Sequence, residues 1–266
     1  MQELHQSSQK HYGVEMLGAI TGDIIGSRFE ANNHLSREFE LFLGDESFFT
    51  DDTALTIAVA RWLLGEDELS NLLVETVERY PRLSYGGMFY LWAVRGGGEP
   101  YNSFGNGSAM RVSPVAVFAQ DEQDCMELAK QSAAVTHNHL EGIKGAQATA
   151  WAAYKASHGV DCREIRNEIQ NKFGYDMRKT VAEWADGYQF DVTCQGTVPP
   201  ALTCALEASD FEDAMRSAVS IGGDTDTICA ICGTLAEPMF GVPDDIKYET
   251  LIRLDDHMRS VLDRCS

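Results

Sequence analysis

Ser220–Thr227 (SIGGDTDT) and Phe49–Thr53 (FTDDT) are the two stretches on which the predicted fold depends. Each places two acidic residues and neighbouring threonines at the start of an apolar segment that is typical of a buried helix. If the two stretches met, their carboxylates would repel one another unless cations lay between them. Oxygen ligands without cysteine or histidine suit Mg²⁺, Mn²⁺ or Ca²⁺ better than zinc. We therefore predict an acidic site for two divalent cations where the stretches meet.

The composition limits the class of protein. The chain has 266 residues, enough for one large core, and its 21 Lys+Arg against 41 Asp+Glu give a net charge of −20. Such a charge repels a phosphate backbone and disfavours nucleic-acid binding. Seven cysteines, an odd number, favour a reducing compartment such as the cytoplasm over a disulfide framework. The polar start is unlike a signal peptide, and no apolar run reaches the roughly 18 residues that cross a membrane.

The hydrophobic periodicity predicts helices and no strands, because apolar residues recur at helical spacing and never alternate over a long run. We expect a polar extension over residues 1–13 and one compact all-α domain over residues 14–266. Pro199 and Pro200 are expected in the first turn of a helix, and Pro238 at the end of another. The main predicted helices are Val14–Ile25, Asp51–Leu64, Leu69–Tyr80, Asp121–Ala134, Leu140–Ala156, Ala201–Ala208, Thr225–Glu237 and Asp244–Leu262.

Glycines mark two further features. Gly18, Gly22 and Gly26 leave one face of the first helix without side chains, which permits either tight helix packing or close approach to a ligand. A long loop, Gly96–Gly107, leads into a short helix, and glycines in that position present backbone N–H groups to an anion such as phosphate. His137 follows at the entrance of a later helix, where capping, packing and contact with a substrate all stay open.

Five motifs in order resemble those of the ADP-ribosylglycohydrolases, a family that includes the dinitrogenase reductase-activating glycohydrolase and the ADP-ribosylhydrolases of animals. The resemblance covers about residues 14–237, and the segment around Tyr85 is similar to that of compact bacterial members. The motifs are Gly18–Asp23 with Glu30, Phe49–Thr53, Gly105–Arg111, Thr136–His137 and Gly222–Thr227.

The resemblance implies a single all-α domain of orthogonal helices with a binuclear site for two Mg²⁺ or Mn²⁺ ions at its centre. Glu30 is similar to a glutamate that contacts the metal or the attacking water, and we take it as the candidate base. The acid that protonates the leaving group stays open between Asp52 and Asp226. The implied metal ligands are Thr50, Asp51, Asp52, Asp224, Asp226 and Thr227, and the implied substrate-binding residues are Tyr85, Gly105, Asn106, Gly107, Ser108 and His137.

The function that the resemblance implies is hydrolysis of the glycosidic bond between ADP-ribose and a modified group, on a small molecule or a protein. Arginine, serine, an acetyl ester and a smaller ribosyl compound are all open as the group attached to the ribose. One alternative is a two-metal phosphoesterase acting on a nucleotide-like substrate, since acidic pairs also serve phosphoryl chemistry. The other is a non-catalytic relative that binds ADP-ribose or resembles a crystallin. The sequence does not give the oligomeric state.

Overall fold

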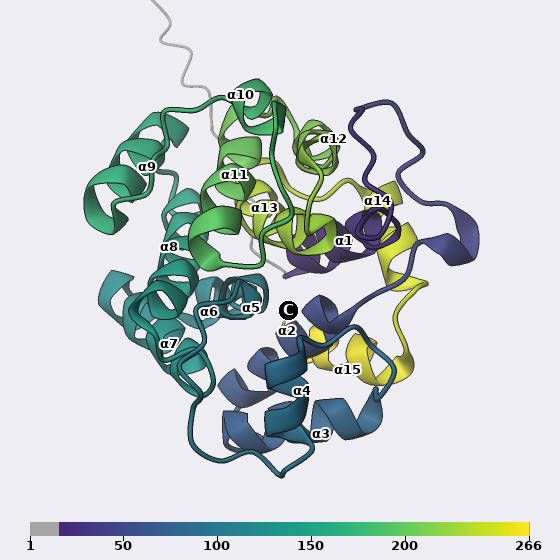
Figure 1. The fold of residues 1–266 in the computed structure, drawn as a ribbon, viewed down its shortest axis with the longest axis vertical. Helices are drawn as coiled ribbons and strands as arrows, with labels where there is room; N and C mark the ends of the chain where they lie inside the picture. The colour runs from purple at the N-terminus through teal and green to yellow at the C-terminus, as the bar shows by residue number, and fades with distance from the viewer. Residues whose placement is uncertain (1–15, 266) are drawn as a thin grey trace, which may run out of the picture.

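The computed structural model describes residues 16–265, which form an all-α fold with no strand in that range. Figure 1 shows the helices gathered into one compact body, as predicted. The expected extension over residues 1–13 lies outside the described residues. Within residues 16–265, no helix is both long and apolar enough to cross a membrane. The α-helices are α1 (Leu17–Gly26), α2 (Asp51–Leu63), α3 (Leu69–Arg79), α4 (Gly87–Ala93), α5 (Gly107–Met110), α6 (Ser113–Phe118), α7 (Glu122–Ala134), α8 (Leu140–Ser157), α9 (Cys162–Glu168), α10 (Val181–Ala185), α11 (Cys194–Glu207), α12 (Phe211–Ile221), α13 (Thr225–Phe240), α14 (Asp244–Leu251) and α15 (Asp256–Cys265).

Helix α13 lies at the centre of the fold. All its residues from Thr225 to Pro238 are buried, because apolar and small side chains occupy every face of the helix. Helices α1, α8, α11 and α12 pack around it (Figure 1). Its Cys229 and Cys232 have the spacing of a CxxC motif, but burial raises the pKa of both thiols well above the ordinary value. They are therefore neutral core residues.

The glycine face of α1 packs directly on the backbone of α13. A Cβ on Gly18 would lie 2.3 Å from the carbonyl oxygen of Gly233, and one on Gly22 would lie 2.1 Å from that of Cys229. A Cβ on Gly26 would lie 2.6 Å from the carbonyl oxygen of Thr225. Side chains at these positions would push the helices apart. Of the two predicted uses of the glycines, tight packing is the one observed, and it brings the end of α1 to the first turn of α13.

Helix α11 begins earlier than the sequence indicated. Its first residue is Cys194, and the side chain of Thr193 caps it by accepting from the N–H of Gly196 at 3.1 Å. Pro199 and Pro200 thus lie inside the helix, so the predicted first-turn position is wrong. A proline has no N–H to donate, and the carbonyl of Gly196, four residues before Pro200, instead accepts from the hydroxyl of Tyr188 at 3.1 Å.

Two other boundaries differ from the prediction. Helix α13 continues through Pro238 to Phe240, where Gly241 ends it at a positive φ of 72°. The predicted helix over 244–262 is two helices, α14 and α15, separated by a turn at residues 252–255. Both differences arise because a proline or an amphipathic pattern is compatible with several helix boundaries, and tertiary contacts choose among them.

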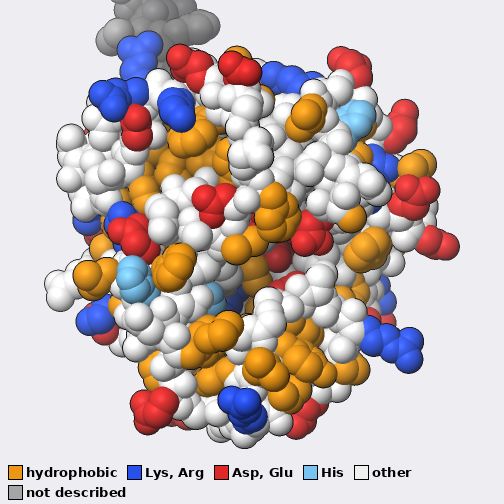
Figure 2. All heavy atoms as spheres, viewed as in Figure 1, with side chains coloured by type: hydrophobic (Ala, Val, Ile, Leu, Met, Phe, Trp, Pro, Cys, Tyr) orange, Lys and Arg blue, Asp and Glu red, His pale blue; other side chains and the backbone are white. Residues whose placement is uncertain are grey.

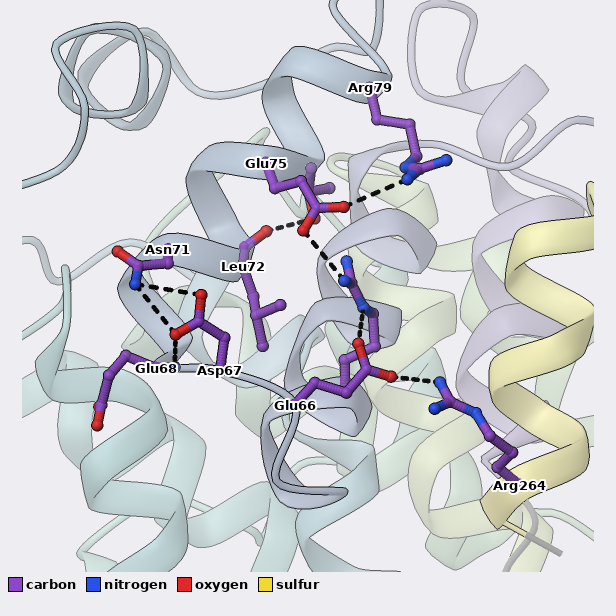
Figure 3. A network of polar contacts seen from close by, with 10 residues as sticks. Glu66, Asp67, Glu68, Asn71, Leu72, Glu75, Arg79 and Arg264 are labelled. Atoms are coloured by element: carbon purple, nitrogen blue, oxygen red, sulfur yellow. Dashed lines mark hydrogen bonds and ion pairs between the residues drawn. The ribbon is translucent and has the colours of Figure 1, made fainter.

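A surface network joins α2 to α3 and α15 (Figure 3). Arg61 of α2 donates to Glu66 at 2.6 Å and to Glu75 of α3 at 3.0 Å, and Arg264 of α15 donates to Glu66. Such partly exposed pairs contribute about 0–1 kcal/mol each. They align the far ends of these helices, while the buried glycine contact of α1 and α13 positions the acidic residues.

Candidate functional site

A cleft of about 400 Å³ lies where the N-terminal ends of α2, α5 and α13 approach one another. Figure 2 shows a hollow near the middle of this face, with acidic side chains inside it and hydrophobic side chains at its border. Ten of the residues predicted for the site line the cleft: Glu30, Asp51, Asp52, Gly105, Asn106, Gly107, His137, Asp224, Asp226 and Thr227.

The first acidic segment starts α2. Thr50 caps this helix, its side chain accepting from the N–H of Asp52, and both Asp51 and Asp52 are buried in the first turn. Asp23 of α1 holds the segment in place: its carboxylate accepts from the N–H of Thr50 at 2.9 Å and from the N–H of Thr53 at 3.0 Å. Carboxylates at the start of a helix are favoured by the helix dipole.

The second acidic segment starts α13. Gly222 and Gly223 turn the chain there with φ values of 75° and 80°, a conformation that favours glycine. Asp224 precedes the helix, and its carboxylate accepts from the side-chain amide of Asn106 at 2.6 Å. Asp226 follows in the first turn, also buried.

The two segments meet. The hydroxyl of Thr227 lies 3.4 Å from a carboxylate oxygen of Asp52, although the residues are 175 positions apart in the sequence. Glu30, just beyond α1, joins the second segment: it can offer one carboxylate oxygen to a group with Asp224 and Asp226 in which all three oxygens lie within 4.8 Å of one another.

Burial and mutual repulsion raise the pKa values of these carboxyls. Loss of water, and then the charge of Asp23, raises the pKa of Asp51 to about 7. The pKa values of Asp52 and Asp226 rise well above the ordinary value, chiefly through burial. The second cause is a neighbouring negative charge: that of Asp226 acts on Asp52, and that of Asp224 acts on Asp226. Without a counter-charge, the protein therefore favours the protonated forms.

The donor set fits divalent cations. One carboxylate oxygen of Asp52 is buried and has no hydrogen-bond partner among the described residues, which is costly unless a cation or a proton satisfies it. The candidate ligands are all oxygens, as Mg²⁺ and Mn²⁺ prefer. Asp51 and Asp52 on one side, and Glu30, Asp224 and Asp226 on the other, can hold such ions.

Three predicted residues lie beside the cleft rather than along it. The hydroxyl of Thr50 donates to Asp23 at 2.7 Å, and that of Ser108 donates to the carbonyl oxygen of Gly142 at 2.7 Å. The hydroxyl of Tyr85 points to the carbonyl oxygen of Thr76 at 3.4 Å. Because the Ser108 hydroxyl is used within the protein, only its backbone N–H is left for the predicted anion cradle.

His137 forms part of the cleft wall. Its Nδ1 lies 2.7 Å from the hydroxyl of Thr136, and its other ring nitrogen, Nε2, faces the glycine loop. A Cβ on Gly107 would lie 3.2 Å from this Nε2, so glycine leaves room for the ring. Burial, and then the charge of Arg111, lowers the pKa of His137 well below the ordinary value. The imidazole is therefore neutral at pH 7.

Sequence analysis missed two residues that shape the site. Asp23 is fully buried in α1 and organises the start of α2. A lone acid within the apolar run Leu17–Ile25 was the available signal, because a buried carboxylate needs donors. Phe190 also lines the cleft while more than half exposed, and it belongs to an irregular segment with no periodicity to indicate its place.

Known proteins resemble this chain in sequence and in fold. The family model described as ADP-ribosylglycohydrolase matches residues 10–260. The chain is 29% identical to ADP-ribosylhydrolase ARH3 of Xenopus tropicalis, over 85% of this chain and 86% of the relative. It is 26% identical to ADP-ribosylarginine hydrolase Tri1 of Pseudomonas putida (strain GB-1), over 85% and 70% respectively. A solved structure described as an ADP-ribosylglycohydrolase-related protein complex has the same fold, with a TM-score of 0.71, 24% identity and 95% of both chains covered.

Proposed function

The chain belongs to the ADP-ribosylglycohydrolase family, and we propose that it hydrolyses the glycosidic bond between ADP-ribose and a modified group with the help of two divalent cations. The observation that carries the proposal is the contact of Thr227 with Asp52, which joins two distant acidic segments in one cleft. Relatives named as hydrolases of ADP-ribosyl linkages support the choice of substrate.

Mg²⁺ or Mn²⁺ would be held by the two acidic segments. We assign Thr50, Asp51 and Asp52 to one side and Asp224, Asp226 and Thr227 to the other, with Glu30 close to the second. The hydroxyl of Thr50 gives its proton to Asp23, so it would offer an oxygen lone pair. The bound ions would orient the ribose hydroxyls and make a bound water more acidic.

The carboxylates also suit the positive charge that develops during the reaction. Breaking the bond at the ribose C1 builds positive charge on the sugar, and a wall of buried acids stabilises that charge. Glu30 is our candidate base, since it is half-buried in the cleft and burial, followed by the charge of Asp224, raises its pKa. A raised pKa brings a carboxylate closer to the range of an effective base. Asp52 and Asp226 are the candidate acids.

The remaining cleft residues suit a nucleotide-bearing ligand. Gly105, Asn106 and Gly107 lie along one wall of the cleft. The N–H of Gly105 donates to the hydroxyl of Ser103 and that of Asn106 to the carbonyl oxygen of Val192, so the N–H groups of Gly107 and Ser108, in the first turn of α5, are the candidates to bind an anion. Met88, Phe190 and Val192 add exposed apolar surface at the same cleft. We propose an ADP-ribosylated small molecule or protein as the partner, and expect the odd cysteine count to reflect a reducing cytoplasm.

A substrate panel tests the proposal. Purified protein is incubated with ADP-ribosyl-arginine, an ADP-ribosyl-serine peptide and O-acetyl-ADP-ribose, each with Mg²⁺, with Mn²⁺ and with EDTA, and the products are separated by chromatography. We expect intact ADP-ribose from at least one donor, and none with EDTA. Release of phosphate or AMP would favour a phosphoesterase instead. If wild-type protein with cations releases nothing from any donor, the proposed function is wrong.

A further inference from the structure

Arg111 is a buried charge among the residues that line the cleft, and the proposed chemistry does not use it. Its side chain is 0% exposed, and its Nη2 donates to the carbonyl oxygen of Ser132 at 2.9 Å and to the hydroxyl of Thr136 at 3.0 Å. Its Nε and Nη1 have no hydrogen-bond partner among residues 16–265. Burying a guanidinium so incompletely paired is costly, which points to a role beyond packing.

The Thr136 hydroxyl joins Arg111 to His137. It lies 3.0 Å from the Arg111 Nη2 and 2.7 Å from the Nδ1 of His137. A guanidinium can only donate, so the Thr136 oxygen accepts from it and keeps one proton to give. An oxygen that accepts a hydrogen bond from a cation becomes a stronger donor and a weaker acceptor, which favours donation from the Thr136 hydroxyl to His137 over acceptance from it. The Nδ1 of His137 then receives the Thr136 proton.

We propose that Arg111 is a positioning residue that acts through Thr136 to hold His137 as the tautomer with its proton on Nε2. The cleft wall then presents a neutral N–H donor, next to Gly105 and Gly107, to an acceptor oxygen of the bound ligand. The ligand part of this proposal rests on the proposed function; the tautomer does not. Without Arg111, the Thr136 hydroxyl is free to turn and accept from Nδ1, which would leave Nε2 an acceptor that repels such an oxygen.

The tautomer is measured directly by long-range ¹H–¹⁵N NMR of ligand-free protein, with the His137 signals assigned by their loss in His137→Asn. We expect a protonated Nε2 and an unprotonated Nδ1 in the wild type. Thr136→Val and Arg111→Met should give a mixture of both tautomers, and Thr136→Ser should restore the wild-type state. A wild-type ring protonated on Nδ1 would overturn the proposal, and so would unchanged tautomers in Thr136→Val. The wild-type spectrum decides even where a variant fails to fold.

Binding of ADP-ribose, measured by calorimetry, separates positioning from structural loss. We expect Thr136→Val to raise the Kd about tenfold, with Thr136→Ser close to wild type. Thr149→Val is the matched control, because Thr149 is equally buried and its hydroxyl has no hydrogen-bond partner in the described part of the chain. An equal loss of affinity for ADP-ribose in Thr136→Val and Thr149→Val would contradict a specific role of Thr136. If wild-type protein binds no ADP-ribose, the proposed function is wrong, while the NMR result still stands on its own.

Discussion

The carboxylate of Asp23 accepts hydrogen bonds from both the backbone N–H and the hydroxyl of Thr50, at 2.9 and 2.7 Å. Asp23 lies on α1, whose glycine face packs on α13, and Thr50 caps α2. The contact therefore links the helix that positions the second acidic segment to the helix that carries the first. We expect the distance between the two segments to depend on this buried carboxylate.

Asp23→Asn should destabilise the fold and weaken cation binding together. An asparagine keeps one acceptor but turns an N–H group toward the donors of Thr50 and Thr53, and each buried donor left unpaired costs about 1–3 kcal/mol. We expect the free energy of unfolding in urea to fall by roughly 2–4 kcal/mol. Unchanged stability and unchanged Mn²⁺ affinity would show that Asp23 does not organise the site.

Gly22→Ala should separate α1 from α13. The new methyl group would lie 2.1 Å from the carbonyl oxygen of Cys229, so the backbones must move. Overpacking of this kind costs about 1–3 kcal/mol or more, and we expect a lower melting temperature with weaker Mn²⁺ binding. Gly86→Ala is the control for stability, since a Cβ there meets nothing within 4 Å. Equal melting temperatures of the two variants would contradict the packing account.

Much of the fold could be predicted because it follows local rules. The start of α2 at Asp51 and the bounds of α7 and α8 are close to those expected, since caps and apolar periodicity fix them. The extent of α11 could not be predicted. It carries two prolines inside the helix, and the carbonyl of Gly196, which Pro200 cannot satisfy, accepts from Tyr188 of an irregular segment.

The same division holds for the site: the residue types could be predicted, and the contacts of each side chain could not. The acidic pairs were visible as residue types at helix starts, and their meeting in one cleft agrees with the expected charge pattern. The hydrogen-bond partner of each donor group could not be predicted from the sequence. Asn106 donates its side-chain amide to Asp224, and Ser108 uses its hydroxyl on Gly142, because tertiary packing decides where each side chain points.

Asp51→Asn and Asp224→Asn should each weaken Mn²⁺ binding and lower turnover at least a hundredfold, with the fold retained. Each substitution removes one charged oxygen ligand and leaves the size of the side chain unchanged. Calorimetric titration with Mn²⁺ and initial rates on the best donor of the panel measure both effects. Asp263→Asn, at an exposed position of α15, is the matched control for loss of one acidic charge. Wild-type affinity and rate in both site variants would exclude the assigned ligands.

The stabilising effect of a cation should increase with pH. Folding raises the pKa of Asp51 to about 7, so native protein binds more protons than unfolded protein between about pH 4 and 7, and metal-free stability falls as pH rises through that range. A cation replaces those protons. At about 100 times its Kd, Mn²⁺ should raise the melting temperature by roughly 5–10 °C at pH 8. We expect a smaller shift at pH 5, and a larger one there would reverse the predicted sign.

Glu30→Gln should leave Mn²⁺ largely bound while lowering kcat by roughly two to four orders of magnitude, as for loss of a general base. The amide keeps an oxygen near Asp224 and Asp226 but cannot take a proton. Single-turnover rates at saturating Mn²⁺ measure the effect. An unchanged kcat would remove Glu30 from the chemistry, and a large loss of Mn²⁺ affinity would make it chiefly a metal ligand.

The sharing of one cleft by two divalent cations is tested most directly by the anomalous difference map of crystals grown with Mn²⁺. We predict two manganese peaks in the cleft, one within coordination distance of Asp51 and Asp52 and the other within that distance of Asp224 and Asp226. A map with manganese only on the outer surface, and none between these aspartates, would contradict the metal site and the hydrolytic function built on it.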